Sequence, residues 1–254
     1  MIDAGVLRAE WTKFSSIRVT MVLSLAIFGV SGLFGWLFGN ASAGEYATAT
    51  PQERLDFQPL DMGMRGLFIA QLLISALGVL VASSEYGSGT MRPSLAAVGR
   101  RGRLMAAKAT MTALVALPVS VAGVWLMFTA SQAALAANGA PYLMPGDPGV
   151  LRLLLLGPVV FTLLALFGLA LGLLLRGTAS AVNVSTAFLL LPVLSSSTPA
   201  FLRDLIHTYW PNMAAFQAVS GTSELPPVVA FGVLVGFVAV MLVAAFVQVK
   251  NRDA

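Results

Sequence analysis

The sequence predicts an all-α, polytopic membrane protein with six transmembrane helices, an amphipathic helix before the first of them and a short helix on the cytoplasmic side. Two observations predict this class. Only 10% of the 254 residues are charged and 57% are hydrophobic, whereas soluble domains contain about 25% charged residues. The charged residues are also grouped, so that six long windows contain none. This composition excludes a soluble globular enzyme, because too few polar side chains remain to cover a surface facing water.

Each uncharged window is long enough to cross a bilayer as a helix, which takes roughly 20 residues. The windows lack the alternation of polar and apolar residues that a membrane β-strand requires. A helix also satisfies its own backbone N–H and C=O groups inside lipid. We therefore expect a single transmembrane domain over residues 1–254, with spans near residues 19–38, 65–83, 106–130, 152–175, 179–199 and 227–249.

Basic residues predict how the spans are oriented, because Lys and Arg resist translocation. With the N-terminus inside, eleven of the 15 Lys and Arg residues fall on the cytoplasmic side and four fall outside. We therefore expect a plasma-membrane protein with both termini in the cytoplasm. The excess of Arg over Lys, with abundant Ala, Leu and Val, indicates a bacterial source.

The first apolar run offers an alternative to a transmembrane span. It ends near Ala41, Ser42 and Ala43, a pattern of small residues that is typical of signal-peptide cleavage. The apolar core of a signal peptide has about 7–15 residues. This run has about 20, which favours a span.

Residues 1–18 have the pattern of an interfacial helix. Its apolar face would lie at the boundary between headgroups and acyl chains, with the basic side chains near lipid phosphates. A basic anchor that only sets the orientation is the alternative reading. The residues assigned to this helix are Leu7, Trp11, Lys13, Phe14 and Arg18.

The loop at residues 84–105 predicts a short helix between two turns. Thr90 can cap its start, Pro93 is compatible with its first turn, and Gly99 suits its end. Leu95 belongs to its apolar face. Such a helix fits a groove on a soluble partner. A basic hairpin that serves topology alone is the alternative.

With these residues the chain resembles the permease subunits of type-2 ABC exporters, in particular the small six-span permeases of bacterial drug and peptide exporters. The resemblance lies in the basic and aromatic run at residues 8–14, the acidic residue and Gly-Thr pair after the second span, and the basic cluster before the third. It implies that the loop couples the spans to an ATP-hydrolysing subunit. The coupling residues that it implies are Glu85, Tyr86, Gly89, Thr90, Arg92, Leu95, Arg100 and Arg101.

In that family the second and fifth spans border the translocation path. The residues that the resemblance places there are Phe68, Gln71, Ser75, Asn183 and Thr186. Hydrogen bonds between helices, without substrate contact, are the alternative for the polar members of this set. The segment between residues 195 and 227 is too rich in proline to cross the membrane, and it resembles the re-entrant helices that cap the exit in type-2 exporters.

Three pairs of glycines spaced four residues apart predict close contacts between helices. Packing within the chain is the favoured use of these pairs. They are Gly35 and Gly39, Gly168 and Gly172, and Gly232 and Gly236.

The expected function is that of a non-catalytic permease subunit of an ATP-driven exporter, which moves an amphipathic or hydrophobic substrate by alternating access at a homodimer interface. The sequence contains no Gly-x-x-x-x-Gly-Lys-Ser/Thr motif, so ATP and Mg are expected on a partner ATPase and no cofactor or metal on this chain. The expected partners are that ATPase, a second copy and membrane lipid. A net charge of +4 gives no indication of nucleic-acid binding.

Two other classes of function remain as alternatives. One is a membrane scaffold or immunity-type protein that transports nothing. The other is an intramembrane hydrolase, which needs a nucleophile with a base or a bound metal. The single histidine, His207, lies in an external loop without the motif partners that such an enzyme requires.

Overall fold

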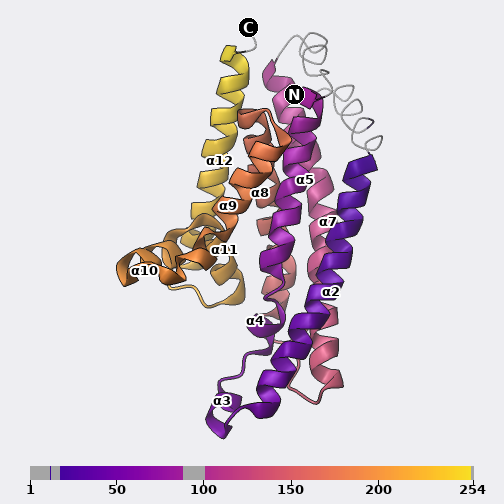
Figure 1. The fold of residues 1–254 in the computed structure, drawn as a ribbon, viewed down its shortest axis with the longest axis vertical. Helices are drawn as coiled ribbons and strands as arrows, with labels where there is room; N and C mark the ends of the chain where they lie inside the picture. Colours follow the sequence, from indigo (N-terminus) through magenta and orange to yellow (C-terminus); the bar gives the residue numbers. More distant parts are fainter. Residues whose placement is uncertain (1–11, 13–17, 88–100, 253–254) are drawn as a thin grey trace.

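The computed structural model describes residues 12, 18–87 and 101–252. Every regular element in these ranges is a helix (Figure 1), which confirms the all-α class. The helices are α2 (Arg18–Thr48), α3 (Pro51–Leu55), α4 (Pro59–Gly63), α5 (Leu67–Gly87), α7 (Arg101–Ala137), α8 (Val150–Leu175), α9 (Thr178–Leu194), the 3-10 turn η1 (Ser195–Ser197), α10 (Ala200–Tyr209), α11 (Pro211–Ser220) and α12 (Pro227–Arg252).

Five helices within the described ranges are long and apolar enough to cross a membrane, namely α2, α5, α7, α8 and α12. They run along the long axis of the molecule, and the first four alternate in direction along the chain (Figure 1). Many of their outward side chains are large and apolar, such as Leu25 on α2 and Val240 on α12, each 67% exposed. These features support a multi-pass membrane protein.

The fifth predicted span is shorter than expected. It was predicted over residues 179–199, but α9 has 17 residues, about 26 Å at 1.5 Å per residue. The helix ends just after Pro192, where Ser195–Ser197 form a 3-10 turn. The count of six membrane-crossing helices therefore stays a prediction.

The first and third spans are longer than predicted. α2 has 31 residues and α7 has 37, whereas the uncharged windows suggested residues 19–38 and 106–130. α7 continues because its sequence is rich in Ala, Leu and Met, which favour helix. The turn after α7 contains Gly139, whose φ of 69° lies in the left-handed region that glycine adopts without strain.

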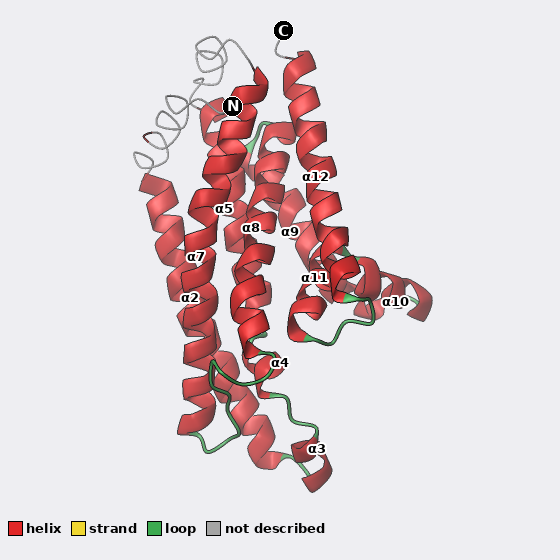
Figure 2. Ribbon diagram, turned by 180° about the vertical axis from the view of Figure 1, so that it is seen from behind, coloured by secondary structure: helices red, strands yellow, loops and turns green. Residues whose placement is uncertain are grey.

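The segment between α9 and α12 forms two helices of ten residues each, α10 and α11. α10 extends sideways from the bundle (Figures 1 and 2) and buries none of its residues. α11 turns back and packs on α8 and α12. Neither helix is long enough to cross a bilayer, in agreement with the prediction from the prolines.

Basic and acidic residues gather at opposite ends of the helix bundle. One end, here called the basic end, is where α7 begins and α5, α8 and α12 finish (Figure 1). Its described charged residues include Arg103, Arg176 and Lys250. The opposite end, here called the acidic end, carries α3 and α4 with most of the described acidic residues, which include Glu45, Glu53, Asp56, Asp61 and Asp147.

The closest helix contact joins α5 to α8. A Cβ added to Gly78 would collide with the carbonyl oxygen of Ala165, and one added to Gly168 would collide with that of Ser75. A Cβ at Gly172 would lie 2.8 Å from the carbonyl oxygen of Val79. Only glycine allows the two backbones to approach this closely.

Two of the three predicted glycine pairs lie in contacts within the chain. Besides the pair on α8, a Cβ at Gly35 or Gly39 on α2 would lie 2.5 Å from a backbone oxygen of α7. For Gly232 and Gly236 on α12, no other part of the described chain lies within 4 Å of that position. For this third pair the prediction of packing within the chain is wrong, because the glycines point away from the bundle.

Replacing Gly168 by Ala should push α5 away from α8, because the new methyl group meets rigid backbone. Overpacking of this kind costs about 1–3 kcal/mol. Thermal unfolding of the purified protein in detergent should therefore begin at a lower temperature. Gly232→Ala is the matched control, since it makes the same change in a membrane helix without a neighbour. Equal melting temperatures for the two variants would contradict the assigned contact.

Candidate functional site

A buried pair of amide side chains joins three helices near the middle of the molecule. The Nδ2 of Asn212 on α11 donates to Oε1 of Gln71 on α5 over 3.1 Å, and to the carbonyl of Leu189 on α9 over 3.3 Å. Both amide side chains belong to fully buried residues. The Gln71 Nε2 and Asn212 Oδ1 atoms have no hydrogen-bond partner among the described residues. One side chain therefore ties α11 to two long helices, but the pair is only partly satisfied.

Hydroxyl groups hold α9 along α5. The Oγ atoms of Ser75 and Ser185 lie 2.6 Å apart in buried surroundings. Nearer the basic end, Oγ1 of Thr178 donates to Oγ of Ser83 over 2.8 Å. Such hydrogen bonds join helices in lipid, where apolar side chains gain little by leaving one apolar surrounding for another.

The far end of α11 is held by α8. The Nε of Arg152 donates to the carbonyl of Val219 over 2.8 Å, which satisfies an oxygen at the end of the helix. Gly221 then ends α11 with a φ of 90°. A side chain at Gly221 would be strained and would also collide with the Arg152 guanidinium. α8 therefore fixes the position at which α11 ends.

Aromatic side chains pack around the start of α11. The indole Nε1 of Trp210, which immediately precedes α11, donates to the carbonyl of Phe188 over 3.0 Å. The Phe188 ring stacks on Phe237 of α12 with centroids 4.9 Å apart and an angle of 6°. The start of α11 is therefore packed between α9 and α12.

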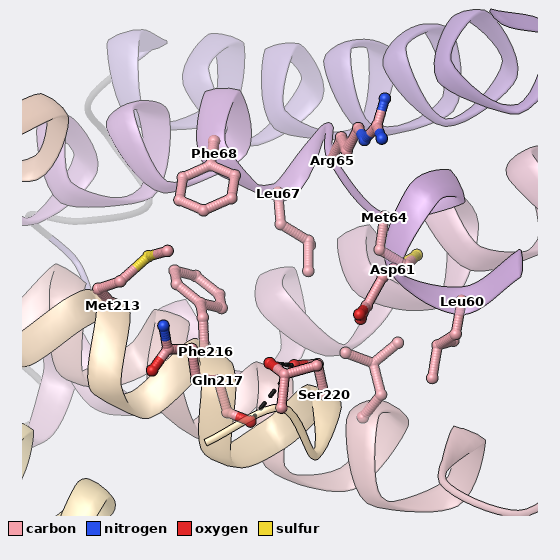
Figure 3. Close-up of a pocket in the computed structure, with 12 residues that line it drawn as sticks. Leu60, Asp61, Met64, Arg65, Leu67, Phe68, Met213, Phe216, Gln217 and Ser220 are labelled. Carbon is pink, nitrogen blue, oxygen red and sulfur yellow. Dashed lines mark hydrogen bonds between the residues drawn. The ribbon is translucent and has the colours of Figure 1, made fainter. Parts of the chain in front are cut away.

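A cavity of about 190 Å³ lies between α4 and α5 on one side and α11 on the other, toward the acidic end (Figure 3). Leu153 of α8 also lines it. Most of its wall is apolar. The residues that line it are Leu60, Asp61, Met64, Arg65, Leu67, Phe68, Leu153, Met213, Phe216, Gln217, Ser220 and Thr222.

Two charged residues line this cavity, and they are oriented differently. The carboxylate of Asp61 points into the space between Leu67 and Ser220, whereas the Arg65 guanidinium extends away from it (Figure 3). Arg65 Nη1 lies 3.4 Å from Oε1 of Glu45. Partial burial raises the pKa of the Asp61 carboxyl, and the positive charge of Arg65 opposes that rise. The cavity therefore has an apolar wall and one inward carboxyl group.

At the basic end, Tyr86 in the last turn of α5 contacts the end of α8. The Arg176 guanidinium lies 5.6 Å from the centroid of its ring, a cation–π distance. Arg176 follows α8 in a left-handed conformation with a φ of 56°. Lys108 on α7 is also buried at this end, with 1% of its surface exposed. The end of α5 is therefore held against α8 as well.

The five residues predicted to line a translocation path differ in their surroundings. Phe68 lines the cavity described above. Gln71 and Ser75 are buried and form hydrogen bonds within the chain. On α9, Asn183 is exposed and Thr186 is half-buried. A path made by all five stays a prediction.

The predicted coupling residues are only partly described. Glu85 and Tyr86 lie in the last turn of α5, Arg101 begins α7, and Arg18 of the interfacial helix begins α2. The other residues predicted for coupling and for the interfacial helix lie outside the described residues. They are Gly89, Thr90, Arg92, Leu95, Arg100, Leu7, Trp11, Lys13 and Phe14.

Three polar residues that sequence reasoning did not select contribute to these contacts. Asn212 follows Trp210 and Pro211, a start signal for a helix that could have directed attention to it. For Arg152 and Asp61 the sequence alone gives no sign of a contact partner. Within the described ranges, no group of three or more His, Asp or Glu residues lies together as a metal site would require.

Comparison of the chain with protein-family models gives no match, and no curated protein matches it either. The function is therefore argued from the geometry and from the sequence pattern.

Replacing Gln71 or Asn212 by Leu should lower the free energy of unfolding by about 1–3 kcal/mol, because each change leaves a buried polar group of the other residue unpaired. The double variant should lose less than the sum of the two single losses, since no amide is then left without its partner. Unfolding in mixed micelles of detergent and dodecyl sulfate measures all four proteins. Strictly additive losses would show that the two amides do not interact.

Proposed function

We propose that this chain is the transmembrane permease subunit of an ATP-driven exporter in a bacterial plasma membrane. A separate ATPase subunit supplies the energy, and two copies of the chain enclose the path for an amphipathic or hydrophobic substrate. Both termini face the cytoplasm, and α9 is the fifth of six spans. The proposal rests on the resemblance of residues 7–18 and 84–105 to type-2 ABC permeases together with the arrangement of α5.

The contacts of α5 carry the mechanical part of the proposal. The last turn of α5 begins the predicted coupling segment, residues 84–105. Along its length α5 is packed on α8 at Gly78 and Gly168, and it holds α11 through Gln71. A displacement applied at the basic end therefore acts on a rigid pair of helices that reaches α11.

The separation of charges supports the orientation. Arg103, Arg176 and Lys250 lie at the basic end, and most described acidic residues lie at the other. Because Lys and Arg remain in the cytoplasm, the basic end faces inward. The predicted coupling segment then lies where a soluble ATPase is accessible, and the cavity beside α11 faces outward.

In the proposed cycle, ATP binding brings two ATPase subunits together and displaces the coupling segments. The α5–α8 pairs move with them, the inward path closes, and α11 shifts to open the outer exit. Nucleotide must bind more tightly to one conformation than to the other, since equal affinity for both shifts no population. In this cycle α11 separates from α5 at the partly satisfied contact between Gln71 and Asn212.

An exposed polar residue on α9 supports the proposal that two copies of the chain form a dimer. Asn183 places an amide on the outside of a helix whose neighbouring residues, such as Val184, are apolar. A polar side chain facing lipid is unfavourable, and such groups usually face a helix interface or an aqueous cavity. In the proposed dimer, Asn183 faces the partner or the path between the copies.

Mild detergent extraction should co-purify a subunit of roughly 30 kDa with a phosphate-binding loop at a helix N-terminus.

Replacing Glu85 or Arg92 by Ala should leave membrane insertion intact and allow ATP hydrolysis to continue, but it should abolish most ATP-driven uptake into inside-out vesicles. A panel of fluorescent amphipathic dyes serves as the transported probe.

Asp56→Ala and Arg203→Ala are matched controls, because they remove the same charges away from the basic end. Normal uptake in the Glu85 and Arg92 variants would refute the coupling role. Purification without any nucleotide-hydrolysing subunit would instead favour a membrane scaffold.

The chain contains no cysteine, so a single introduced thiol reports on one position. Asn183→Cys should form a disulfide-linked dimer in membranes treated with a mild oxidant, because the proposed interface brings the two copies of α9 together. Leu155→Cys on α8, an exposed apolar position, is the control and should remain monomeric. Cross-linking at Leu155 without cross-linking at Asn183 would place the dimer interface elsewhere.

A further inference from the structure

The cavity between α5 and α11 combines features that single out one class of ligand. Its inward charged group is Asp61, because Arg65 extends away toward Glu45 (Figure 3). Glu45, Asp61 and Arg65 together carry one net negative charge when both carboxyl groups are ionised. A cation entering the cavity would therefore be attracted, and an anion would meet the Asp61 carboxylate.

The aromatic part of the cavity wall also favours a positively charged ligand. Phe68 on α5 and Phe216 on α11 both line it, and their ring centroids lie 5.8 Å apart. Aromatic faces attract organic ammonium ions through their quadrupole. Leu67 and Met213 add surface for an apolar body.

The size of the cavity limits the ligand. An engineered apolar cavity of about 150 Å³ binds benzene, and this cavity measures about 190 Å³. It can hold one six-membered ring or a short alkyl chain with a single small polar group. A drug-sized molecule would extend beyond it through the open side of the cavity, since sites for such ligands measure roughly 300 Å³ or more.

We propose that this cavity binds a small organic ammonium ion with one ring or a short apolar chain, whose charged nitrogen pairs with the Asp61 carboxylate and whose apolar body packs against Phe68 and Phe216. A neutral ligand would leave the half-buried carboxylate with only the charge of Arg65 to oppose the cost of its burial, whereas an ammonium ion would add a direct partner. This site does not depend on the transport proposal, because it is defined by binding to the chain alone.

The ammonium group could belong to a soluble amine or to the headgroup of a phospholipid. Both place the same charged nitrogen beside the same carboxylate. The cavity lies toward the acidic end of the molecule, where either source is accessible in the proposed orientation. The experiment below separates the two.

The full-length chain is placed in nanodiscs of phosphatidylglycerol and titrated with 4-fluorobenzylamine, whose binding is followed by fluorine NMR. 4-Fluorobenzyl alcohol is the neutral probe of nearly equal size. The amine should bind saturably and at least about tenfold more tightly, as a charge-assisted hydrogen bond implies. Asp61→Asn should remove this preference, whereas Asp56→Asn, which changes a carboxyl outside the cavity, should retain it.

A second variant tests the same site in case Asp61→Asn does not fold. Phe68→Leu keeps the wall apolar but removes one aromatic face, so it should weaken binding of the amine more than binding of the alcohol. Equal affinity for amine and alcohol in the unaltered protein would overturn the proposal, as would an unchanged preference in Asp61→Asn or no saturable binding of the amine.

Nanodiscs that also contain phosphatidylethanolamine distinguish the source. Weaker binding of the amine in these discs than in discs diluted equally with an uncharged glycolipid would identify the lipid headgroup as a competing occupant of the ammonium site, because both dilutions lower the surface charge equally. Unchanged binding would support a soluble amine as the ligand of the same site.

Discussion

The close approach of α5 and α8 is the contact on which the rest of the structure depends. In lipid, apolar side chains gain little by contacting one another instead of acyl chains, so helices associate through tight packing and hydrogen bonds. Gly78 and Gly168 let the two backbones touch. The other helices are then arranged around this pair, because α7, α9, α11 and α12 all pack against α8.

The α5–α8 pair also determines where α11 lies. Gln71 of α5 holds Asn212 near the start of α11, and Arg152 of α8 holds the carbonyl of Val219 near its end. Both bonds come from helices that cannot move apart without breaking the glycine contact. α11 is consequently attached to the same rigid unit that, at its other end, precedes residues 88–100.

The composition of the sequence predicted most of the helices. The residue types at single positions predicted few of the contacts between helices. Uncharged windows identify a membrane helix because lipid excludes charge along its whole length. Five of the six predicted spans therefore coincide with long apolar helices, and the non-crossing segment could be located as well. The fifth span is predicted too long, because a window free of charge takes no account of Pro192 or of the serines at which α9 ends. A glycine pair provides a flat helix surface but does not determine which helix packs on it, and no described part of the chain packs on Gly232 or Gly236. The amide of Asn212 acquires its role only through the fold that brings it to Gln71.

The position of the cavity links ligand binding to the state of α11. Phe68 belongs to α5 and Phe216 to α11, so the two aromatic walls stay together only while α11 remains against α5. A ligand that contacts both rings binds this arrangement better than one in which α11 has moved, and it stabilises the arrangement by that difference in affinity. Asp61 lies on α4, directly before α5, and so moves with the first wall. An occupant of the cavity would therefore oppose separation of α11 from α5, and separation would in turn release the occupant.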